Sequence, residues 1–313
     1  MNDWIKFEGT KDQWNNLVDE FQGNYRQLWE WAEYKQIFSW EVLRFIKITE
    51  NRITHSVQVL AKKKFFVCLA YIPGGISNKN FDGQCLGLED IIFKKYKSYF
   101  TVIRFDSNYK LDKKISKQLE NDLWKRPLRN INQGLSLEFL LDQKSILETA
   151  NRKWRYNYRK SLKNKFQIII DEYPLQYHDK IINVANEMLS LKKDNVDRQE
   201  AVLELSNFFK KKLIVACCIS NKNELLGFRS ALLFGQRSFD IFGAVSIKGR
   251  SLKIGYPLLA KLLDECKNRG AINFNLGGYN PKKKTSQFKI GTGANVYEYV
   301  GEWEKSNSII LSI

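Results

Sequence analysis

The order of apolar segments in the second half of the chain most constrains the fold. From about residue 145 a helical pattern leads into the strand-like run FQIIIDEY (166–173), then into two helical segments and three apolar runs of strand length. An amphipathic helix (255–270) and the strand INFNL (272–276) complete the order. Helix, strand, helices, antiparallel strands, helix and strand within about 150 residues predict one α+β unit.

The first half predicts another mixed unit. Residues 11–36 show two helical patterns separated near Gly23, and a strand follows from about Trp40. The runs 54–63 and 64–72 have the β-branched and aromatic content of a hairpin, and a helix (88–97) and a strand (98–106) come next. A chain of 313 residues fits two domains. We predict them at residues 1–143 and 144–299, with Pro127 and Gly134 marking the connection.

The net charge of +17 predicts an anionic partner, such as phosphate, nucleic acid or an anionic membrane surface. A compositional bias that spreads lysines over solvated faces is the alternative. The first residues lack the pattern of a signal peptide, and the apolar runs are too short to span a bilayer. We therefore expect a cytoplasmic monomer, with at most peripheral contact to a membrane. The 5 cysteines have no C-x-x-C spacing and are predicted to be reduced, and we expect no metal site.

One basic segment, NRKWRYNYRKSLKNK (151–165), contains no carboxylate. On a continuous helix one face would carry an apolar stripe made of Ile146, Ala150, Trp154, Tyr158 and Leu162. The nearly opposite face would carry Arg152, Arg155, Arg159 and Lys163. A row of guanidinium groups suits a polyphosphate or a nucleic-acid backbone, because each group can bind phosphate oxygens bidentately. A solvated basic face without a ligand is the alternative interpretation.

Several motifs in order resemble the Fem family of peptidoglycan bridge-forming aminoacyltransferases. They are QLWEWAEYKQIFSWEVLRF (27–45), YIPGG (71–75), VIRFD (102–106), KWRYNYRKSLK (153–163), FNLGGYNP (274–281) and SQFKIGTGANVYEYVGEWE (286–304). The resemblance implies an α+β fold of two tandem GNAT-like domains. No sustained heptads are present, so the chain resembles the compact form without a helical arm. It further implies that residues 300–313 return to complete the first domain, with NSIILSI (307–313) as a strand.

Members of that family move an amino acid from aminoacyl-tRNA to an amine of a cell-wall precursor. By resemblance, the early tryptophan motif forms the acceptor groove, and the F-K motif lies in the channel for the acyl donor. The basic helix would bind the tRNA backbone and stack its bases on nearby aromatic rings, although a sugar-nucleotide diphosphate would suit it too. An aminoacyl ester is already activated, so the enzyme has to orient an amine, accept a proton and stabilise an oxyanion.

The catalytic residues that we expect are Lys289, Phe288 and Asp106. The substrate-binding residues that we expect are Lys35, Trp31, Tyr71, Arg155, Arg159, Tyr279, Gly291 and Gly293. Glu302 is a further candidate proton acceptor, whereas His55 and His178 are predicted to be structural. Apart from the co-substrate aminoacyl-tRNA, no cofactor is expected.

Two other hypotheses about the function stay open. Acyl-CoA is the rival donor, used by an N-acyltransferase that acts on an amino sugar in surface polysaccharide biosynthesis. Ordinary GNAT enzymes bind the CoA pyrophosphate with a glycine-containing loop at a helix N-terminus. In GRSLKIGYPLL (249–259) Lys253 takes the first glycine position, and a side chain there is expected to crowd the loop. Gly74 also stands where the family has a cation, which leaves the acceptor open. The third reading is a nucleic-acid-binding protein without activity.

Overall fold

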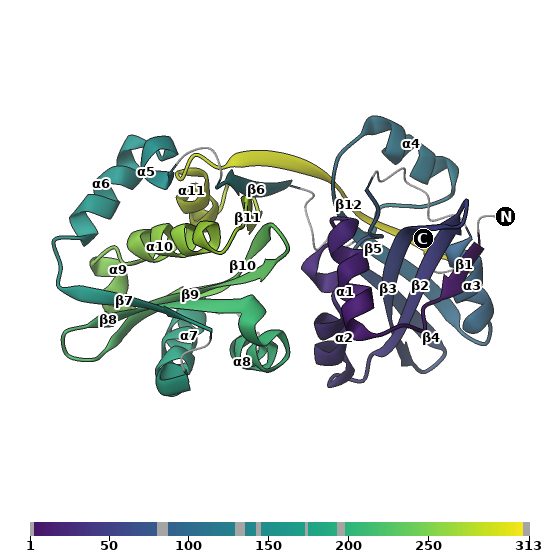
Figure 1. Ribbon diagram of the computed structural model, residues 1–313, viewed down its shortest axis with the longest axis horizontal. Helices are drawn as coiled ribbons and strands as arrows, with labels where there is room; N and C mark the ends of the chain where they lie inside the picture. Colours follow the sequence, from purple (N-terminus) through teal and green to yellow (C-terminus); the bar gives the residue numbers. More distant parts are fainter. Residues whose placement is uncertain are drawn as a thin grey trace. The chain divides into compact units, whose positions relative to one another are not determined.

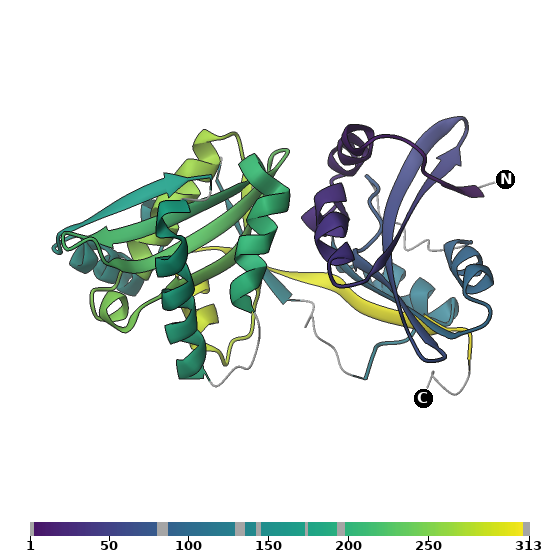
Figure 2. The same cartoon turned by 90° about the horizontal axis from the view of Figure 1, so that it is seen from below.

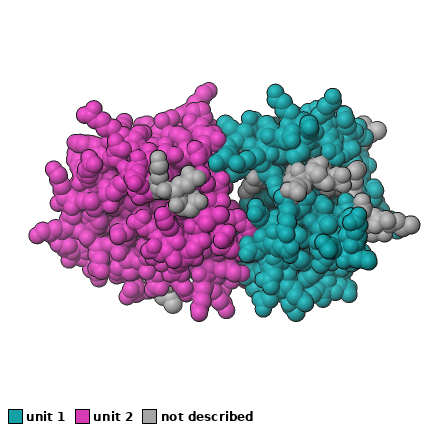
Figure 3. Space-filling view, turned by 45° about the horizontal axis from the view of Figure 1, so that its top comes forward, with its two compact units in different colours: residues 1–135, 297–313 teal, residues 136–296 magenta. Residues whose placement is uncertain are grey.

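The computed structural model describes residues 3–79, 87–128, 135–141, 145–172, 175–192 and 198–308. The chain divides into two compact units (Figure 3). The first comprises Met1–Leu135 and Tyr297–Ile313, and the second comprises Ser136–Val296. The boundary expected between residues 143 and 144 lies outside the described residues. No helix in the described ranges is long and apolar enough to cross a membrane.

The first unit is built on a sheet of mostly antiparallel strands. Its strand order is β1-β2-β3-β4-β5-β12. Among its described strand pairs, only β4 and β5 are parallel, and a helix lies between them in the chain, as is usual for parallel neighbours. The strands are β1 (Asp3–Lys6), β2 (Glu41–Thr49), β3 (Arg52–Lys64), β4 (Val67–Gly74), β5 (Phe100–Lys110) and β12 (Asn295–Ser306).

The helices of the first unit follow the predicted order. They are α1 (Lys11–Glu20), η1 (Tyr25–Gln27), α2 (Trp29–Gln36), α3 (Leu88–Lys95) and α4 (Lys113–Asn121). The break expected near Gly23 is confirmed, because the short 3₁₀ turn η1 separates α1 from α2. Sequence reasoning missed α4, whose apolar stripe is so narrow that only Leu119 is fully buried.

A strand returns to the first unit near the end of the chain. The predicted strand 307–313 lies largely outside the described residues, which end at residue 308. The strand that the structure describes is β12, which pairs antiparallel with β5 and sets Glu302 opposite Asp106. Figure 1 shows it as the long yellow strand.

The second unit has a sheet with the order β6-β11-β10-β9-β8-β7. Its strands are β6 (Leu135–Leu140), β7 (Phe166–Asp171), β8 (Leu213–Ser220), β9 (Leu225–Phe234), β10 (Arg237–Val245) and β11 (Asn273–Gly278). Its helices are α5 (Ile146–Thr149), α6 (Arg152–Ser161), η2 (Leu175–Tyr177), α7 (His178–Lys192), α8 (Arg198–Phe209), η3 (Lys210–Lys212), α9 (Ile247–Ser251), α10 (Gly255–Asn268) and α11 (Lys284–Ile290). Figures 1 and 2 show α10 on one face of this sheet and α7 on the other.

The continuous apolar run of β8 follows from this layering. Ile214, Ala216 and Cys218 belong to the core on the α10 side. Val215 and Cys217 belong to the core on the α7 side. A strand covered on both faces needs apolar residues at every position. Burial raises the pKa of Cys217 and Cys218 to about 12, so these thiols are unreactive.

The predicted continuous helix through the basic segment is wrong. It is broken at Ala150, whose extended backbone (ψ 143°) ends α5, and Asn151 caps the new helix α6. Ile146, Ala150 and Trp154 are buried as the stripe predicts. Leu162, however, is 52% exposed, because α6 ends at Ser161 and its stripe ends there too.

Gly293 offers a test of how tightly α5 packs against the segment after α11. Its φ is +85°, and a Cβ placed there would lie 2.5 Å from the carbonyl oxygen of Thr149. Gly270 has nearly the same φ, +89°, but a Cβ there would meet nothing within 4 Å. Gly270→Ala is therefore expected to cost only the backbone strain, about 1–2 kcal/mol of unfolding free energy. Gly293→Ala should cost about 1–3 kcal/mol more.

Urea unfolding of the two single variants measures this difference directly, since the strain common to both cancels. Equal losses would contradict the close packing of Gly293 on α5.

Candidate acyl-donor cavity and basic helix face

The parallel strands β10 and β11 pair briefly and then part. Their pairing ends at Phe239↔Asn275, although β10 continues to Val245 and β11 to Gly278. Beyond Phe239 the sheet therefore opens at the carboxyl ends of two parallel strands. Ligand sites of α/β sheets commonly lie at such a point.

A cavity of about 630 Å³ opens there. Its wall comes from β9, β10, the start of α10 and helix α11, with Met188 of α7. Among the described residues that line it, one carboxylate stands among five cations: Asp240 with Arg229, Arg250, Lys253, Lys284 and Lys289. The cavity thus combines a cationic wall with the aromatic rings of Phe242, Tyr256 and Phe288, which suits an anionic ligand with an apolar part.

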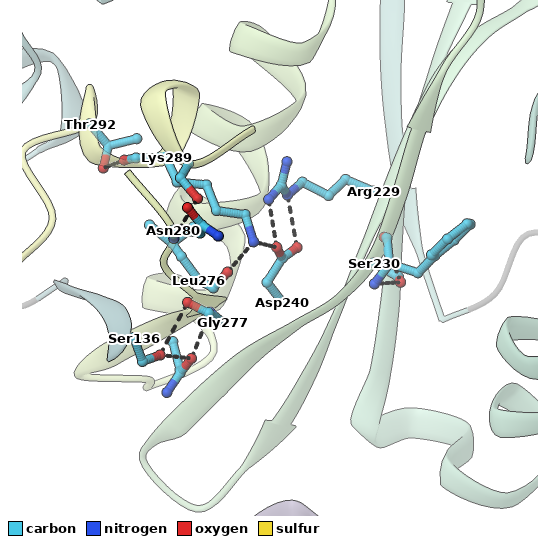
Figure 4. A network of polar contacts seen from close by, with 12 residues as sticks. Ser136, Arg229, Ser230, Asp240, Leu276, Gly277, Asn280, Lys289 and Thr292 are labelled. Carbon is cyan, nitrogen blue, oxygen red and sulfur yellow. Dashed lines mark hydrogen bonds and ion pairs between the residues drawn. The ribbon is translucent and has the colours of Figure 1, made fainter. Parts of the chain in front are cut away.

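Lys289 bridges the two parted strands (Figure 4). Its ammonium donates to the backbone carbonyl of Leu276 in β11 and lies 3.3 Å from Oδ2 of Asp240 in β10. Continued parallel pairing would have set Asp240 opposite Leu276. The lysine therefore stands where strand pairing is lost, and its side chain remains 20% exposed at the cavity wall.

Asp240 is held from a second side by Arg229. The guanidinium makes a bidentate contact, with Nε 2.9 Å from Oδ1 and Nη2 2.6 Å from Oδ2. A register shift between Asp240 and Phe242 marks a bulge in β10, and bulges re-aim neighbouring side chains. One nearly buried carboxylate thus orders two cations at the cavity.

Phe288 belongs to an aromatic group behind the lysine. Its ring centroid lies 5.1 Å from that of Tyr256 and 6.3 Å from that of Trp154. The Tyr256 hydroxyl accepts a hydrogen bond from Asn157 of α6 at 3.0 Å. Burial raises the pKa of Tyr256, which keeps this hydroxyl protonated. Packing therefore fixes the wall on which Phe288 and Lys289 sit.

In the loop before α10, Lys253 adopts a backbone conformation that usually favours glycine. Lys253 has φ +63°, in the left-handed region that favours glycine. Its side chain lines the cavity together with Arg250 and the first residue of α10, Gly255. The lysine side chain therefore does not prevent the left-handed backbone at this position. A helix N-terminus flanked by two cations is a favourable place for phosphate.

The predicted glycines serve the packing of the second unit. A Cβ at Gly291 would lie 3.2 Å from Trp154, and one at Gly293 would meet Thr149. Gly277, at the end of β11, has φ +78°, and a Cβ there would lie 3.7 Å from Nζ of Lys289. Tyr279 packs partly buried against the core on the α10 side. Of these positions, Gly277 is the one beside the lysine.

The basic face of α6 borders a separate, open hollow of about 680 Å³. It is lined by Leu147, Arg152, Arg155, Tyr156 and Arg159. Arg152, Tyr156 and Arg159 are exposed, whereas Arg155 donates to the carbonyl of Ala150 at 2.9 Å and so braces the break between α5 and α6. The expected row of arginines is present, with Arg155 tied to the backbone.

In the first unit, Lys35 and Trp31 lie together on α2. The Lys35 ammonium lies 4.9 Å from the Trp31 ring centroid and 4.8 Å from that of Tyr34. Trp31 also meets Tyr25 edge-on at 5.6 Å. This aromatic setting fixes the direction of the ammonium through cation–π attraction.

Asp106 and Tyr71 form a buried polar group with Arg26. Oδ2 of Asp106 accepts from Arg26 at 2.6 Å, and Oδ1 accepts from the Tyr71 hydroxyl at 2.9 Å and from the Gly74 amide at 2.8 Å. Burial opposes the charge of Arg26, but Asp106 raises its pKa overall. Burial and then Asp106 raise the pKa of Tyr71. This arrangement orients Tyr71 and Arg26 around Asp106.

Gly74 itself has no room for the family's cation. A Cβ there would lie 2.3 Å from Cβ of Asn24, and φ is +81°. The neighbouring guanidinium is that of Arg26, which lies 3.4 Å from the Tyr71 hydroxyl. In this chain Arg26 therefore brings a cation to the YIPGG segment.

Sequence reasoning missed Arg26, Arg229 and Asp240. A signal for the last two exists, because each is the one charged residue of its strand interior: Arg229 in LLGFRSALLF and Asp240 in SFDIFGAV. Opposite charges on successive strands of a meander predict a cross-strand pair. Arg26 carries no comparable signal, since its partner lies 80 residues away.

Comparison with solved structures identifies proteins that share this fold. No family model matches the chain, and no curated protein matches it in sequence. The crystal structure of FemX is similar with a TM-score of 0.85 at 15% identity, covering 98% of both chains. The structure of L-PGS from Bacillus licheniformis follows with a TM-score of 0.61 at 14% identity, over 98% of this chain and 96% of that one. A tandem GNAT protein from the clavulanic acid biosynthesis pathway has a TM-score of 0.62 at 8% identity, over 98% and 99%.

At these identities the likeness concerns the fold. It confirms the predicted α+β architecture of two tandem GNAT units, and the protein folds like FemX along nearly its whole length.

Proposed function

We propose that the protein is an aminoacyltransferase that moves an amino acid from aminoacyl-tRNA to an amine of a cell-envelope precursor. The observation that carries the proposal is the lysine bridge across the parted strands. It holds one ammonium at the wall of a cationic cavity, beside the aromatic ring of Phe288. The fold shared with FemX is in keeping with it, and the sequence motifs that resemble the Fem family imply aminoacyl-tRNA as the donor.

The reaction needs one bond made and one broken. The acceptor amine attacks the carbonyl carbon of the aminoacyl ester, and the tetrahedral adduct carries an oxyanion. Collapse of the adduct breaks the ester C–O bond, and the ribose oxygen leaves with a proton that the amine gives up. In this proposal the Lys289 ammonium stabilises the oxyanion, and its contact with Asp240 orients the ammonium.

Asp240 has a second use in the same proposal. It is the one carboxylate among the described residues that line the cavity. The α-ammonium of an aminoacyl group needs such a partner, whereas the acetyl group of acetyl-CoA carries no charge. The pairing of a carboxylate with surrounding cations therefore favours a donor whose acyl part is positive and whose remainder is polyanionic.

The α6 hollow supports a polyanionic donor as well. Arg152 and Arg159 are exposed beside Tyr156, an arrangement that suits phosphates and a stacked base. The acceptor would use the first unit, where Lys35, Trp31, Tyr71 and Asp106 remain the predicted residues. A cell-envelope precursor that is linked to a nucleotide or a lipid fits their polar and aromatic character.

A second candidate function is an N-acyltransferase with acyl-CoA as donor. The observation that favours it is the left-handed backbone of Lys253 beside the first turn of α10, where a pyrophosphate could bind. The similar tandem GNAT protein, whose structure is one without AcCoA, links this fold to an acyl-CoA ligand.

Lys289→Met tests the transfer step, with Lys284→Met as matched control. Both lysines line the cavity from α11, so each substitution removes one positive charge there. We expect Lys289→Met to lower the single-turnover rate at least about a hundredfold, the typical worth of one preorganised oxyanion donor. Lys284→Met should lower it by less than about threefold, because Lys284 bridges neither strand.

The measurement is transfer of radiolabelled amino acids from total charged tRNA to a UDP-linked or a lipid-linked peptidoglycan precursor in parallel reactions. Equal losses in the two variants would contradict a catalytic role for Lys289. Activity that survives ribonuclease and depends on acyl-CoA would replace the tRNA donor by the second candidate.

Arg152→Gln/Arg159→Gln tests the tRNA site, and Lys113→Gln/Lys114→Gln is the control. The control removes two exposed charges from α4 in the first unit. Plots of log K against log salt should lose about two units of slope in the arginine variant, one for each phosphate contact. The lysine variant should keep the slope nearly unchanged. Arg155 is left in place because it braces the α5–α6 break.

Charged tRNA should also bind more tightly than uncharged tRNA. If both double variants lose the same slope, binding reflects overall charge and the α6 hollow is no tRNA site.

A further inference from the structure

The turn between β3 and β4 breaks the usual rules of a hairpin. It consists of Phe65 and Phe66, since Lys64 pairs with Val67. Two-residue hairpin turns favour glycine and asparagine, because positive φ angles are needed. Phe65 nevertheless has φ +53°, which is costly for a bulky residue. The geometry of the turn therefore does not explain two phenylalanines.

Burial does not explain them either. Phe65 is 84% exposed and Phe66 is 65% exposed. Phe66 contacts the ring of Phe100 at 5.8 Å, and Phe100, at the start of β5, is itself 43% exposed. We call these three side chains the β3–β4 tip. A cluster of exposed aromatic rings that the fold does not use marks an interaction surface.

Lysines surround the tip. Lys62, Lys63 and Lys64 precede it in β3, and Lys64 lies 5.8 Å from the Phe65 ring centroid. The end of α3 and the segment after it add Lys94, Lys95 and Lys97, and Lys63 reaches Tyr96 in that segment at 5.2 Å.

Among the described residues, the carboxylate of Glu41 lies between two of these lysines. It is 3.0 Å from Lys63 and 3.2 Å from Lys95, so it orders two of the cations and leaves the surface positive.

The apolar border extends toward α2. Lys62 donates to the carbonyl of Phe38 at 3.0 Å and lies 5.6 Å from the ring of Trp40. Phe38 is 41% exposed and the adjacent Ile37 is 54% exposed. Aromatic and aliphatic groups thus stand beside lysines at one end of the first unit.

We propose that the β3–β4 tip is a membrane-docking surface that inserts its phenylalanines into the interface of an anionic bilayer. Exposed aromatic side chains surrounded by cations suit the two forces that hold peripheral proteins on such a surface. These are burial of apolar groups and attraction to acidic lipids. The proposal deepens the proposed function, because docking would bring the enzyme to a lipid-linked acceptor.

The test is flotation of the full-length protein with vesicles of phosphatidylcholine, with and without phosphatidylglycerol. Wild type should bind the phosphatidylglycerol vesicles and bind pure phosphatidylcholine much more weakly. Phe65→Ser/Phe66→Ser should lower the partition coefficient at least about tenfold, since two large apolar side chains no longer enter the interface. Lys64→Gln/Lys97→Gln should weaken binding to the acidic vesicles alone and make it less sensitive to salt.

Leu123→Ser is the matched control for lost apolar surface. Leu123 is 72% exposed in the same unit and lies outside the β3–β4 tip. It should leave vesicle binding unchanged. Circular dichroism and the unfolding midpoint of each variant show that the fold is intact, and both Phe→Ser changes lie outside the core.

Three outcomes would overturn the proposal: no binding of wild type to acidic vesicles, binding that survives the double Phe→Ser change, or self-association that this change abolishes without any vesicle binding. The vesicles contain neither tRNA nor acceptor, so the result is independent of the transfer reaction. Transfer to the UDP-linked acceptor in solution should be unaffected by Phe65→Ser/Phe66→Ser, which separates failure of docking from failure of the proposed function.

Discussion

The parting of β10 from β11 after Phe239 is the constraint on which the second unit depends. A backbone carbonyl that loses its neighbouring strand needs another donor, since a buried unpaired group costs about 1–3 kcal/mol. Lys289 supplies that donor to Leu276 and at the same time pairs with Asp240. The same side chain that repairs the sheet therefore presents a charge to the cavity. Its position is fixed by backbone geometry, which is how a site becomes preorganised.

Asp240 makes this arrangement stable only because Arg229 is present. The Asp240 side chain is 9% exposed, and a buried carboxylate is destabilising unless its oxygens are paired. Two hydrogen bonds from one guanidinium satisfy it more completely than a single ammonium could. Lys289 thus adds a further contact to a carboxylate that Arg229 already satisfies, and this contact helps to orient its ammonium.

The sequence predicted most elements of the fold because their apolar periods are long and regular. The strand β8 and the helix α10 are examples, and both lie in the core of the second unit. The break between α5 and α6 escaped prediction because the stripe from Ile146 to Trp154 continues in register across it. What stops the helix is the extended backbone at Ala150, which the adjacent Asn151 then caps. An apolar period shows which residues face the core, but it does not show where a helix is interrupted and capped.

The candidate site residues also differ in how far a local sequence pattern can predict them. Lys289 and Phe288 are predicted from a motif within one short segment. The contact between Arg26 and Asp106 joins residues 80 apart and forms only in the folded chain. Asp106 also shows how burial changes a reading from sequence. As a solitary carboxylate it suggests a base, yet its oxygens accept hydrogen bonds from Arg26, Tyr71 and Gly74. Both carboxylate oxygens are engaged by these donors, so in this geometry Asp106 holds Tyr71 and Arg26 in place.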